Sequence, residues 1–155
     1  MGIEIERKFL VDAIQWQQLS KPVGTNFKQG YIVNDATKTI RIRVTDQYAC
    51  LTFKGETLGF TRSEYEYTIP IEDGIEMLDK FAGPIIQKTR YCINFENKLW
   101  EVDVFSGDNE GLIVAEIELE QENEQFKLPH WVTQEVTGQE KYYNSNLSAH
   151  PFKEW

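Results

Sequence analysis

Cysteine, histidine and methionine are scarce in this chain of 155 residues, with two of each. Cys50 and Cys92 lie far apart and form neither a CxxC pair nor a His/Cys cluster, so no zinc site or disulfide framework is predicted. No apolar run approaches the roughly 18 residues of a membrane-spanning helix, and the N-terminus lacks the apolar region of a signal peptide. Reduced thiols in a cytoplasmic protein without a membrane segment are therefore expected.

Positive charge is also scarce. Sixteen Lys and Arg residues stand against 25 Asp and Glu, for a formal net charge of -9 at pH 7. This balance argues against non-specific binding to nucleic acid. An acidic protein that binds a polyanion needs its few bases concentrated, with a metal as a bridge. The length and the 41% hydrophobic content suit one domain over residues 1–155 with its own core.

Helical patterns are few and short. Asp12 is a candidate N-cap for a helix through Leu19, a second helix is expected over 73–81, and a third over 138–147. Most of the remaining sequence alternates between polar and apolar residues, which predicts about eight strands joined by short turns. These strands are expected at 4–8, 31–33, 40–44, 51–54, 64–69, 88–95, 100–104 and 115–120.

Charges on the polar faces of these strands are sorted by sign. The acidic faces carry Glu4/Glu6 (before Lys8), Glu64/Glu66, Glu101/Asp103 and Glu116/Glu118/Glu120, and the basic faces carry Arg41/Arg43, Lys54 and Lys88/Arg90. Like charges packed close together repel unless something neutralises them. The sorting favours a functional surface, although a solvated sheet face remains an open alternative at this point.

A closed sheet explains this sorting. We expect a mainly β (α+β) protein, with eight antiparallel strands closed into a β-barrel whose polar faces line a charged tunnel. The apolar faces then point outward, where a few short helices cover them. Mg²⁺ and Mn²⁺ prefer oxygen ligands shared between carboxylates and phosphates, and Arg binds phosphate bidentately. The inventory therefore fits a short polyphosphate held between bases and a metal.

The ordered motifs resemble those of the CYTH superfamily, the triphosphate tunnel metalloenzymes. The N-terminal ExExK of Glu4, Glu6 and Lys8 is followed by an RxR pair, a lone Lys, an ExE pair, a KxR pair and a late ExE. The similarity extends to Glu135-Val136-Thr137 and Lys141-Tyr142-Tyr143-Asn144 near the end of the chain. A lone ExExK is weak, whereas the ordered set is specific.

The resemblance implies a role for each group of residues. The residues implied to bind triphosphate oxygens are Lys8, Arg41, Arg43, Lys54, Lys88 and Arg90. The residues implied to ligate the metal that grips the substrate are Glu4, Glu6, Glu116 and Glu118. Glu66 and Asp103, with Glu64, are implied to serve a second metal or to position the attacking water. Tyr31 resembles a tunnel tyrosine that pairs with Lys8, and a packed strand aromatic is an equal alternative.

These roles predict an enzyme, a phosphoric anhydride hydrolase that uses Mg²⁺ or Mn²⁺ to convert inorganic triphosphate into pyrophosphate and phosphate. Its partner is then a small polyphosphate, with no nucleic acid and no membrane, and a homodimer is compatible with the sequence. Three alternatives stay open: a class IV adenylyl cyclase, a thiamine or nucleoside triphosphatase, and a non-catalytic polyphosphate-binding module.

Other conspicuous residues are interpreted as structural. Arg62 has the parity of Glu64, so a position at the tunnel mouth is an alternative, but a surface ion pair is the favoured interpretation. The aromatics expected to pack under the helices on the outer face are Tyr65, Tyr67, Tyr91 and Trp100. Cys50 and Cys92 share the inward parity and are expected to be small fillers.

Overall fold

The computed structural model describes residues 2–155, which form nine antiparallel strands and three short α-helices. The strands are β1 (Ile3–Val11), β2 (Thr25–Asn34), β3 (Lys38–Val44), β4 (Ala49–Gly55), β5 (Thr61–Ile69), β6 (Ile86–Phe95), β7 (Lys98–Phe105), β8 (Ile113–Glu118) and β9 (Val132–Glu135). The helices are α1 (Ala13–Gln18), α2 (Ile71–Lys80) and α3 (Asn144–Ala149). The strand order is β5-β4-β3-β2-β6-β7-β8-β1-β9.

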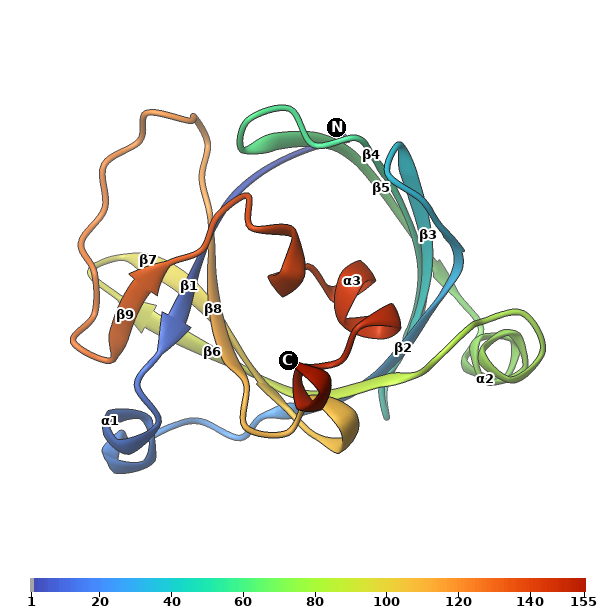
Figure 1. Ribbon diagram of the computed structural model, residues 1–155, viewed down its shortest axis with the longest axis horizontal. Helices are drawn as coiled ribbons and strands as arrows, with labels where there is room; N and C mark the ends of the chain where they lie inside the picture. The colour runs from blue at the N-terminus through green and yellow to red at the C-terminus, as the bar shows by residue number, and fades with distance from the viewer. Residues whose placement is uncertain (1) are drawn as a thin grey trace.

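The sheet closes on itself because β1 also pairs with β5. Ile3 pairs with Ser63 and Ile5 with Thr61, so eight strands form a ring that surrounds a central space (Figure 1). The expected closed antiparallel sheet of eight strands is thereby confirmed. Strand side chains alternate in direction, so closure brings the polar faces of all eight strands into one interior.

Tight turns set the register between neighbouring strands. The β6–β7 hairpin turns at Glu96 and Asn97, whose φ angles are 50° and 63°. Two consecutive residues with positive φ match the twist of the flanking strands, and Asn tolerates this conformation well. The hairpin therefore places the inner residues of β6 opposite those of β7, with Arg90 paired to Asp103.

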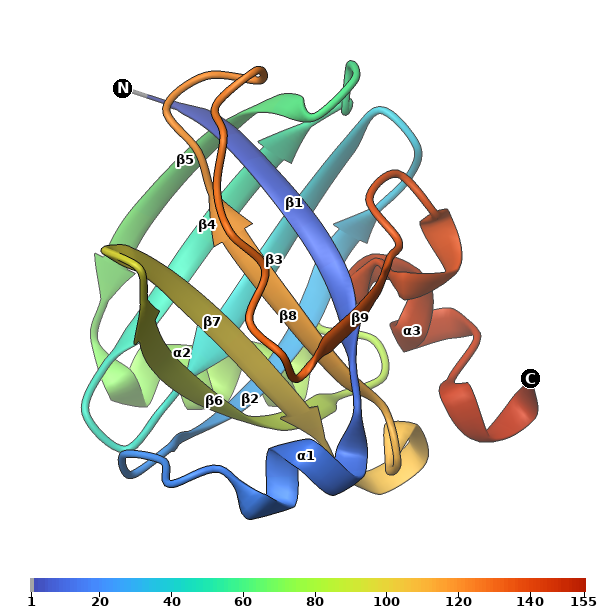
Figure 2. The same cartoon turned by 90° about the vertical axis from the view of Figure 1, so that its left-hand side faces the viewer.

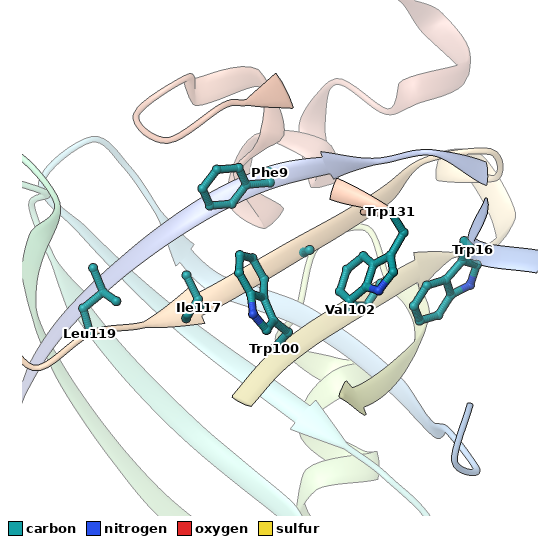
Figure 3. Packing of buried hydrophobic residues seen from close by; sticks show 8 residues of the cluster. Phe9, Trp16, Trp100, Val102, Ile117, Leu119 and Trp131 are labelled. Carbon is teal, nitrogen blue, oxygen red and sulfur yellow. The ribbon is translucent and has the colours of Figure 1, made fainter. Parts of the chain in front are cut away.

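The main apolar core lies outside the ring, against β1, β7 and β8 (Figure 3). Trp100 and Trp131 are almost fully buried, with ring centroids 6.0 Å apart in an edge-to-face arrangement. Trp16 of α1 packs on Trp131 at 5.7 Å, and Phe9 of β1 packs on Trp100 at 5.5 Å. Aromatic pairs at these distances add to the stabilisation from area burial. This outer layer holds rigid the part of the ring that carries the N-terminal motif.

Two helices lie on the outside of the ring. Asp12 caps α1 by accepting a hydrogen bond from the Gln15 amide at 2.9 Å, as its sequence position predicts. Helix α2 begins at Ile71 rather than Asp73, and it approaches the sheet closely at Gly74. A Cβ on Gly74 would lie 2.7 Å from that of Ala49, so only glycine allows this contact.

The outer face is covered less completely than the sequence suggested. Tyr65 and Tyr67 are 52% and 58% exposed, so the prediction that they pack under helices is wrong. Both lie on β5, and α2 contacts β3 and β4 instead. No helix in residues 2–155 combines the length and the apolar character needed to cross a membrane.

The C-terminal segment was expected to add a third covering helix. It instead lies across one end of the ring, as two views show (Figures 1 and 2). Asn34 donates a hydrogen bond to the Ser145 carbonyl at 2.7 Å, which ties α3 to the end of β2. The Phe152 amide donates to Asn109 at 2.8 Å, which ties the tail to the β7–β8 connection. This segment closes one end of the ring and brings Tyr143, Asn144 and Ser145 to the interior.

Candidate active site

A cavity of about 390 Å³ occupies the interior of the ring. Of the residues singled out as site candidates from the sequence, all but Asp103 line it. The predicted residues on its wall are Glu4, Glu6, Lys8, Tyr31, Arg41, Arg43, Lys54, Glu64, Glu66, Lys88, Arg90, Glu116 and Glu118. The residues that alternation assigned to the inner faces of separate strands thus line one chamber.

Asp103 is buried and does not line the chamber, but it joins two bases that do. Its Oδ2 accepts from Lys88 Nζ at 2.7 Å, and its Oδ1 accepts from Arg90 Nε at 2.7 Å. Burial alone would raise the pKa of Asp103, but Arg90 and then Lys88 outweigh it and bring the pKa to about 2. Burial lowers the pKa of Lys88 to about 7, although Asp103 opposes that shift. The Asp103 carboxylate therefore holds the side chains of Lys88 and Arg90 in place.

The RxR pair of β3 supplies a second basic wall. Arg41 Nη2 donates to the Thr52 hydroxyl at 3.2 Å and lies 3.9 Å from Glu66 Oε2. Arg43 Nε donates to Gln29 at 3.1 Å. Burial, followed by the charge of Arg41, lowers the pKa of Arg43 to about 10.

Arg41 carries a donor without a partner. Its Nε is buried and has no hydrogen-bond acceptor among the described residues, although the side chain lies on the chamber wall. An unsatisfied buried donor is costly, and more so when it is charged. The donor is therefore suited to an anionic oxygen delivered by a ligand.

The first acidic residue of the ExExK motif is held by two bases. Lys54 Nζ lies 3.0 Å from Glu4 Oε2, and Arg62 Nε donates to the same oxygen at 3.1 Å. Burial opposes ionisation of Glu4, yet Lys54 and then Arg62 lower its pKa well below the usual range. The ring-closing register pairs Glu4 with Arg62 directly. Arg62 thus forms an ion pair, but its side chain lines the chamber, so the favoured surface position is wrong and the alternative at the tunnel is the better description.

Three further carboxylates crowd together on β1 and β8. Glu6 is paired in register with Glu118, and the next inner residue of β8 is Glu116. Burial first, and then the charges of Glu116 and Glu4, raise the pKa of Glu6 well above the ordinary value. Burial and the neighbouring acids also raise the pKa of Glu118. Glu6 and Glu118 therefore lack sufficient positive charge from the protein alone. At Glu116, by contrast, burial is outweighed by Lys8 and then Arg90, which lower the pKa of Glu116.

Lys8 lies on the inner face of β1, beside this acidic group. Its Nζ is 3.4 Å from Glu116 Oε1 and donates to the Tyr142 carbonyl at 3.4 Å. It also lies 5.4 Å from the centre of the Tyr143 ring. Burial opposes the charged form, but Glu116 and Glu6 together raise the pKa of Lys8. Lys8 is therefore a charged donor at the end of the tunnel that the C-terminal segment covers.

Sequence reasoning missed the polar residues that the C-terminal segment brings to the chamber. Asn144 Oδ1 accepts hydrogen bonds from Lys88 Nζ at 3.0 Å and from Nε2 of the Gln29 side chain at 3.2 Å. Gln29 is completely buried and also holds Arg43. The one sequence signal for these residues was the Lys141-Tyr142-Tyr143-Asn144 motif, which is similar to the family's motif. Its residues show no periodicity that would predict where they lie in the fold.

The donor chemistry fits a divalent metal, although the carboxylates are not gathered for one. Within residues 2–155, no three His, Cys, Asp or Glu side chains lie close enough together to hold a metal ion. Glu4 is turned to Lys54 and Arg62, and Glu116 to Lys8. Glu6 and Glu118, whose pKa values are raised by burial and by neighbouring acids, supply the hard oxygen donors that Mg²⁺ and Mn²⁺ prefer. A cation there would offset the burial and the neighbouring negative charges that raise the pKa values of both groups.

Comparisons with known proteins agree with this architecture. The CYTH domain matches residues 2–150. The chain is 47% identical over 154 residues to an inorganic triphosphatase of Acetivibrio thermocellus, covering 99% of this chain and 97% of the relative. It is 33% identical over 150 residues to an inorganic triphosphatase of Nitrosomonas europaea, covering 94% and 96%.

The fold is also similar to that of a solved protein. A crystal structure of an inorganic triphosphatase superposes with a TM-score of 0.66 at 30% sequence identity. The match covers 94% of this chain and 93% of that one. The order of charged strands, the closed sheet with its charged interior and the extent of these matches lead to one conclusion: the chain belongs to the CYTH domain family.

Proposed function

We propose that this protein is an inorganic triphosphatase that hydrolyses triphosphate to pyrophosphate and phosphate inside its tunnel, with a divalent metal. The observation that carries the proposal is the pairing of a buried basic wall with a crowded acidic wall in one chamber. The full-length similarity to two inorganic triphosphatases supports the choice of substrate. The whole of residues 1–155 is proposed to act as one such domain.

The bases are proposed to bind the phosphate oxygens. Arg41 contributes its unpartnered Nε, and Arg43 and Arg90 add planar guanidinium groups suited to bidentate contacts. Lys8, Lys54 and Lys88 add compact positive charges around the same chamber. Binding of a polyanion would draw these bases from their carboxylate partners toward the substrate.

The acids are proposed to hold the cation. Glu4, Glu6, Glu116 and Glu118 supply oxygen ligands on adjoining strands. When bound, the metal supplies positive charge that offsets the charge of the phosphate oxygens. Mg²⁺ and Mn²⁺ are the proposed ions because both take carboxylate and phosphate oxygens.

A second acidic group is proposed to serve the reaction itself. Glu66 and Glu64 line the chamber near Arg41 and Lys54, and they are proposed to serve a second metal or to position the attacking water. Asp103 shares that prediction, and its ion pairs give it the further task of fixing Lys88 and Arg90. Tyr31 lines the same chamber and is proposed to assist Lys8.

The proposed reaction is an in-line displacement at a terminal phosphorus. Water forms the new bond to phosphorus, the bond to the bridging oxygen breaks, and pyrophosphate leaves. Positioning and charge stabilisation do most of the work in such reactions, with little covalent chemistry for the protein. The fixed guanidinium and ammonium groups meet that requirement because they need little reorganisation as charge moves.

The proposal is tested with a substrate panel. Tripolyphosphate, ATP and thiamine triphosphate are incubated with the protein and Mg²⁺ or Mn²⁺, and phosphate release is measured with and without EDTA. The fastest release is expected from tripolyphosphate. Cyclic AMP formed from ATP would favour the cyclase, and tight tripolyphosphate binding without turnover would favour a binding module. A homodimer and a cytoplasmic location stay predictions.

A further inference from the structure

Strand β1 changes partners at Lys8. On one side, Lys8 pairs with Glu116 of β8. On the other side, pairing with β5 ends at Ile5, and pairing with β9 begins only at Phe9. On this side, Lys8 therefore lies between the end of the β5 pairing and the start of the β9 pairing. Regular strand pairing does not fix its backbone there.

Thr137 supplies the missing hydrogen-bond partner beside Lys8. The Lys8 amide donates to Thr137 Oγ1 at 2.9 Å, and the Val136 amide donates to the Lys8 carbonyl at 2.8 Å. A side-chain hydroxyl thus replaces the carbonyl that a regular strand would offer. Buried amides need such a partner, because an unpaired one is costly.

Glu135 sets the direction of this hydroxyl. Thr137 Oγ1 donates its single proton to Glu135 Oε2 at 2.6 Å, which leaves its lone pairs free to accept the Lys8 amide. Arg7 holds the carboxylate bidentately, through Nε at 2.5 Å and Nη2 at 2.6 Å.

Two aromatic rings fix the guanidinium in turn. Arg7 lies 5.0 Å from the ring centroid of Phe60 and 5.3 Å from that of Phe126. Cation–π contacts at these distances restrain the group that anchors Glu135. The contacts therefore run unbroken from the outer surface to the backbone of Lys8.

We propose that Thr137 and Glu135 are positioning residues that act through Lys8. They fix the backbone at Lys8 so that its ammonium points into the tunnel, where it meets the triphosphate. Neither residue lines the 390 Å³ chamber, although Thr137 borders an adjoining cavity of about 30 Å³ that Glu6 and Lys8 also line. The inference rests on the triphosphatase activity proposed above. Misplacement of a catalytic group by about 1 Å is enough to slow an enzyme about 100-fold.

The test compares two substitutions at one position with a matched control. Thr137→Val removes the hydroxyl with little change in shape, and Thr137→Ser keeps it. Thr133→Val is the control, because the Thr133 hydroxyl also bonds β1, donating to the Leu10 carbonyl at 3.3 Å. Thr137→Val is expected to lower kcat/KM for tripolyphosphate about tenfold or more. Thr137→Ser should restore it, and Thr133→Val should leave it unchanged.

A double-mutant comparison separates positioning from general destabilisation. In a Lys8→Ala background, Thr137→Val should weaken tripolyphosphate binding no further, as measured by calorimetry, because its effect passes through Lys8. An equal loss in both backgrounds would overturn the proposal. Should Thr137→Val not fold, Glu135→Gln takes its place in the same comparison.

Amide hydrogen exchange decides the matter independently of turnover. Thr137→Val should speed exchange at the Lys8 amide at least tenfold, and Thr133→Val should leave it unchanged. Unchanged exchange at Lys8 in Thr137→Val would overturn the positioning role. If the wild-type protein neither binds nor hydrolyses tripolyphosphate, the proposed function fails, and this exchange result still decides whether Thr137 fixes Lys8.

Discussion

Lys88 Nζ lies 2.7 Å from Asp103 Oδ2, and both side chains are almost completely excluded from solvent. Arg90 binds the same carboxylate through two nitrogens, at 2.7 and 2.9 Å. One buried anion thus organises two of the bases that are proposed to bind phosphate. Removing one partner of a buried ion pair leaves uncompensated charge, which gives this group a measurable signature.

Asp103→Asn should destabilise the fold. Loss of the carboxylate leaves the buried Lys88 without its ion-pair partner and Arg90 with only the partly exposed Glu101, so the free energy of unfolding should fall by about 3 kcal/mol or more. Urea denaturation measures this directly. Glu101→Gln is the matched control, because Glu101 contacts Arg90 at the partly exposed edge of the chamber and should cost under about 1 kcal/mol. Equal effects of the two substitutions would contradict the buried role of Asp103.

Lys88→Ala should chiefly weaken substrate binding. The ammonium group lies on the chamber wall, and charge-assisted contacts of this kind are worth about 1.5–3 kcal/mol, or roughly 10- to 100-fold in affinity. KM for tripolyphosphate should rise by that factor. Lys28→Ala on the exposed outer face of β2 serves as the control and should change nothing. An unchanged KM in Lys88→Ala would argue against a phosphate contact at this position.

Glu6→Gln should abolish activity while the fold stays intact. Glu6 is repelled by neighbouring carboxylates, so a neutral amide of the same size should not lower the free energy of unfolding. The loss should appear in turnover under Mg²⁺ or Mn²⁺ and in metal binding measured by calorimetry. Glu72→Gln, in the exposed first turn of α2, is the control. Near-normal turnover of Glu6→Gln would remove Glu6 from the proposed metal site.

Glu135 should make stability depend on pH at acidic values. Its hydrogen bond from Arg7 lowers the pKa of Glu135 below 4.5, with Thr137 adding to the shift. A carboxyl whose pKa is lower in the folded state contributes stability above its unfolded pKa, and that contribution is lost as pH falls through the folded pKa. Wild type should therefore exceed Glu135→Gln in thermal stability at pH 7, with the difference shrinking below pH 4.5. A difference independent of pH would contradict this ion pair.

The tunnel wall was predictable because strand geometry has a period of 2. Once Glu4, Arg41 and Lys88 are assigned to strands, alternation and closure place them in one interior whatever the details of the loops. The sorting of acidic and basic residues onto separate strands then predicted that this interior is a charged site for a polyphosphate and a metal. Local alternation is the strongest structural signal in this sequence.

Features set by contacts between distant segments were not predictable. The place of Arg62 depends on the β1–β5 register that closes the ring, and nothing near Arg62 in the sequence encodes that register. Strand β9 has only four residues, and α3 only six, too few for a clear periodicity. Asn144 lies in α3 and Thr137 follows β9, so the contacts of these two residues emerged only in three dimensions.

Identification of the products tests the central claim most directly. Tripolyphosphate is incubated with the protein and Mg²⁺ or Mn²⁺, and the products are followed by phosphorus NMR, with EDTA and the Glu6→Gln variant as controls. One pyrophosphate and one orthophosphate should form for each tripolyphosphate consumed, and both controls should be silent. Tight binding of tripolyphosphate without any product under either metal, or equal turnover in EDTA, would contradict a metal-dependent triphosphatase.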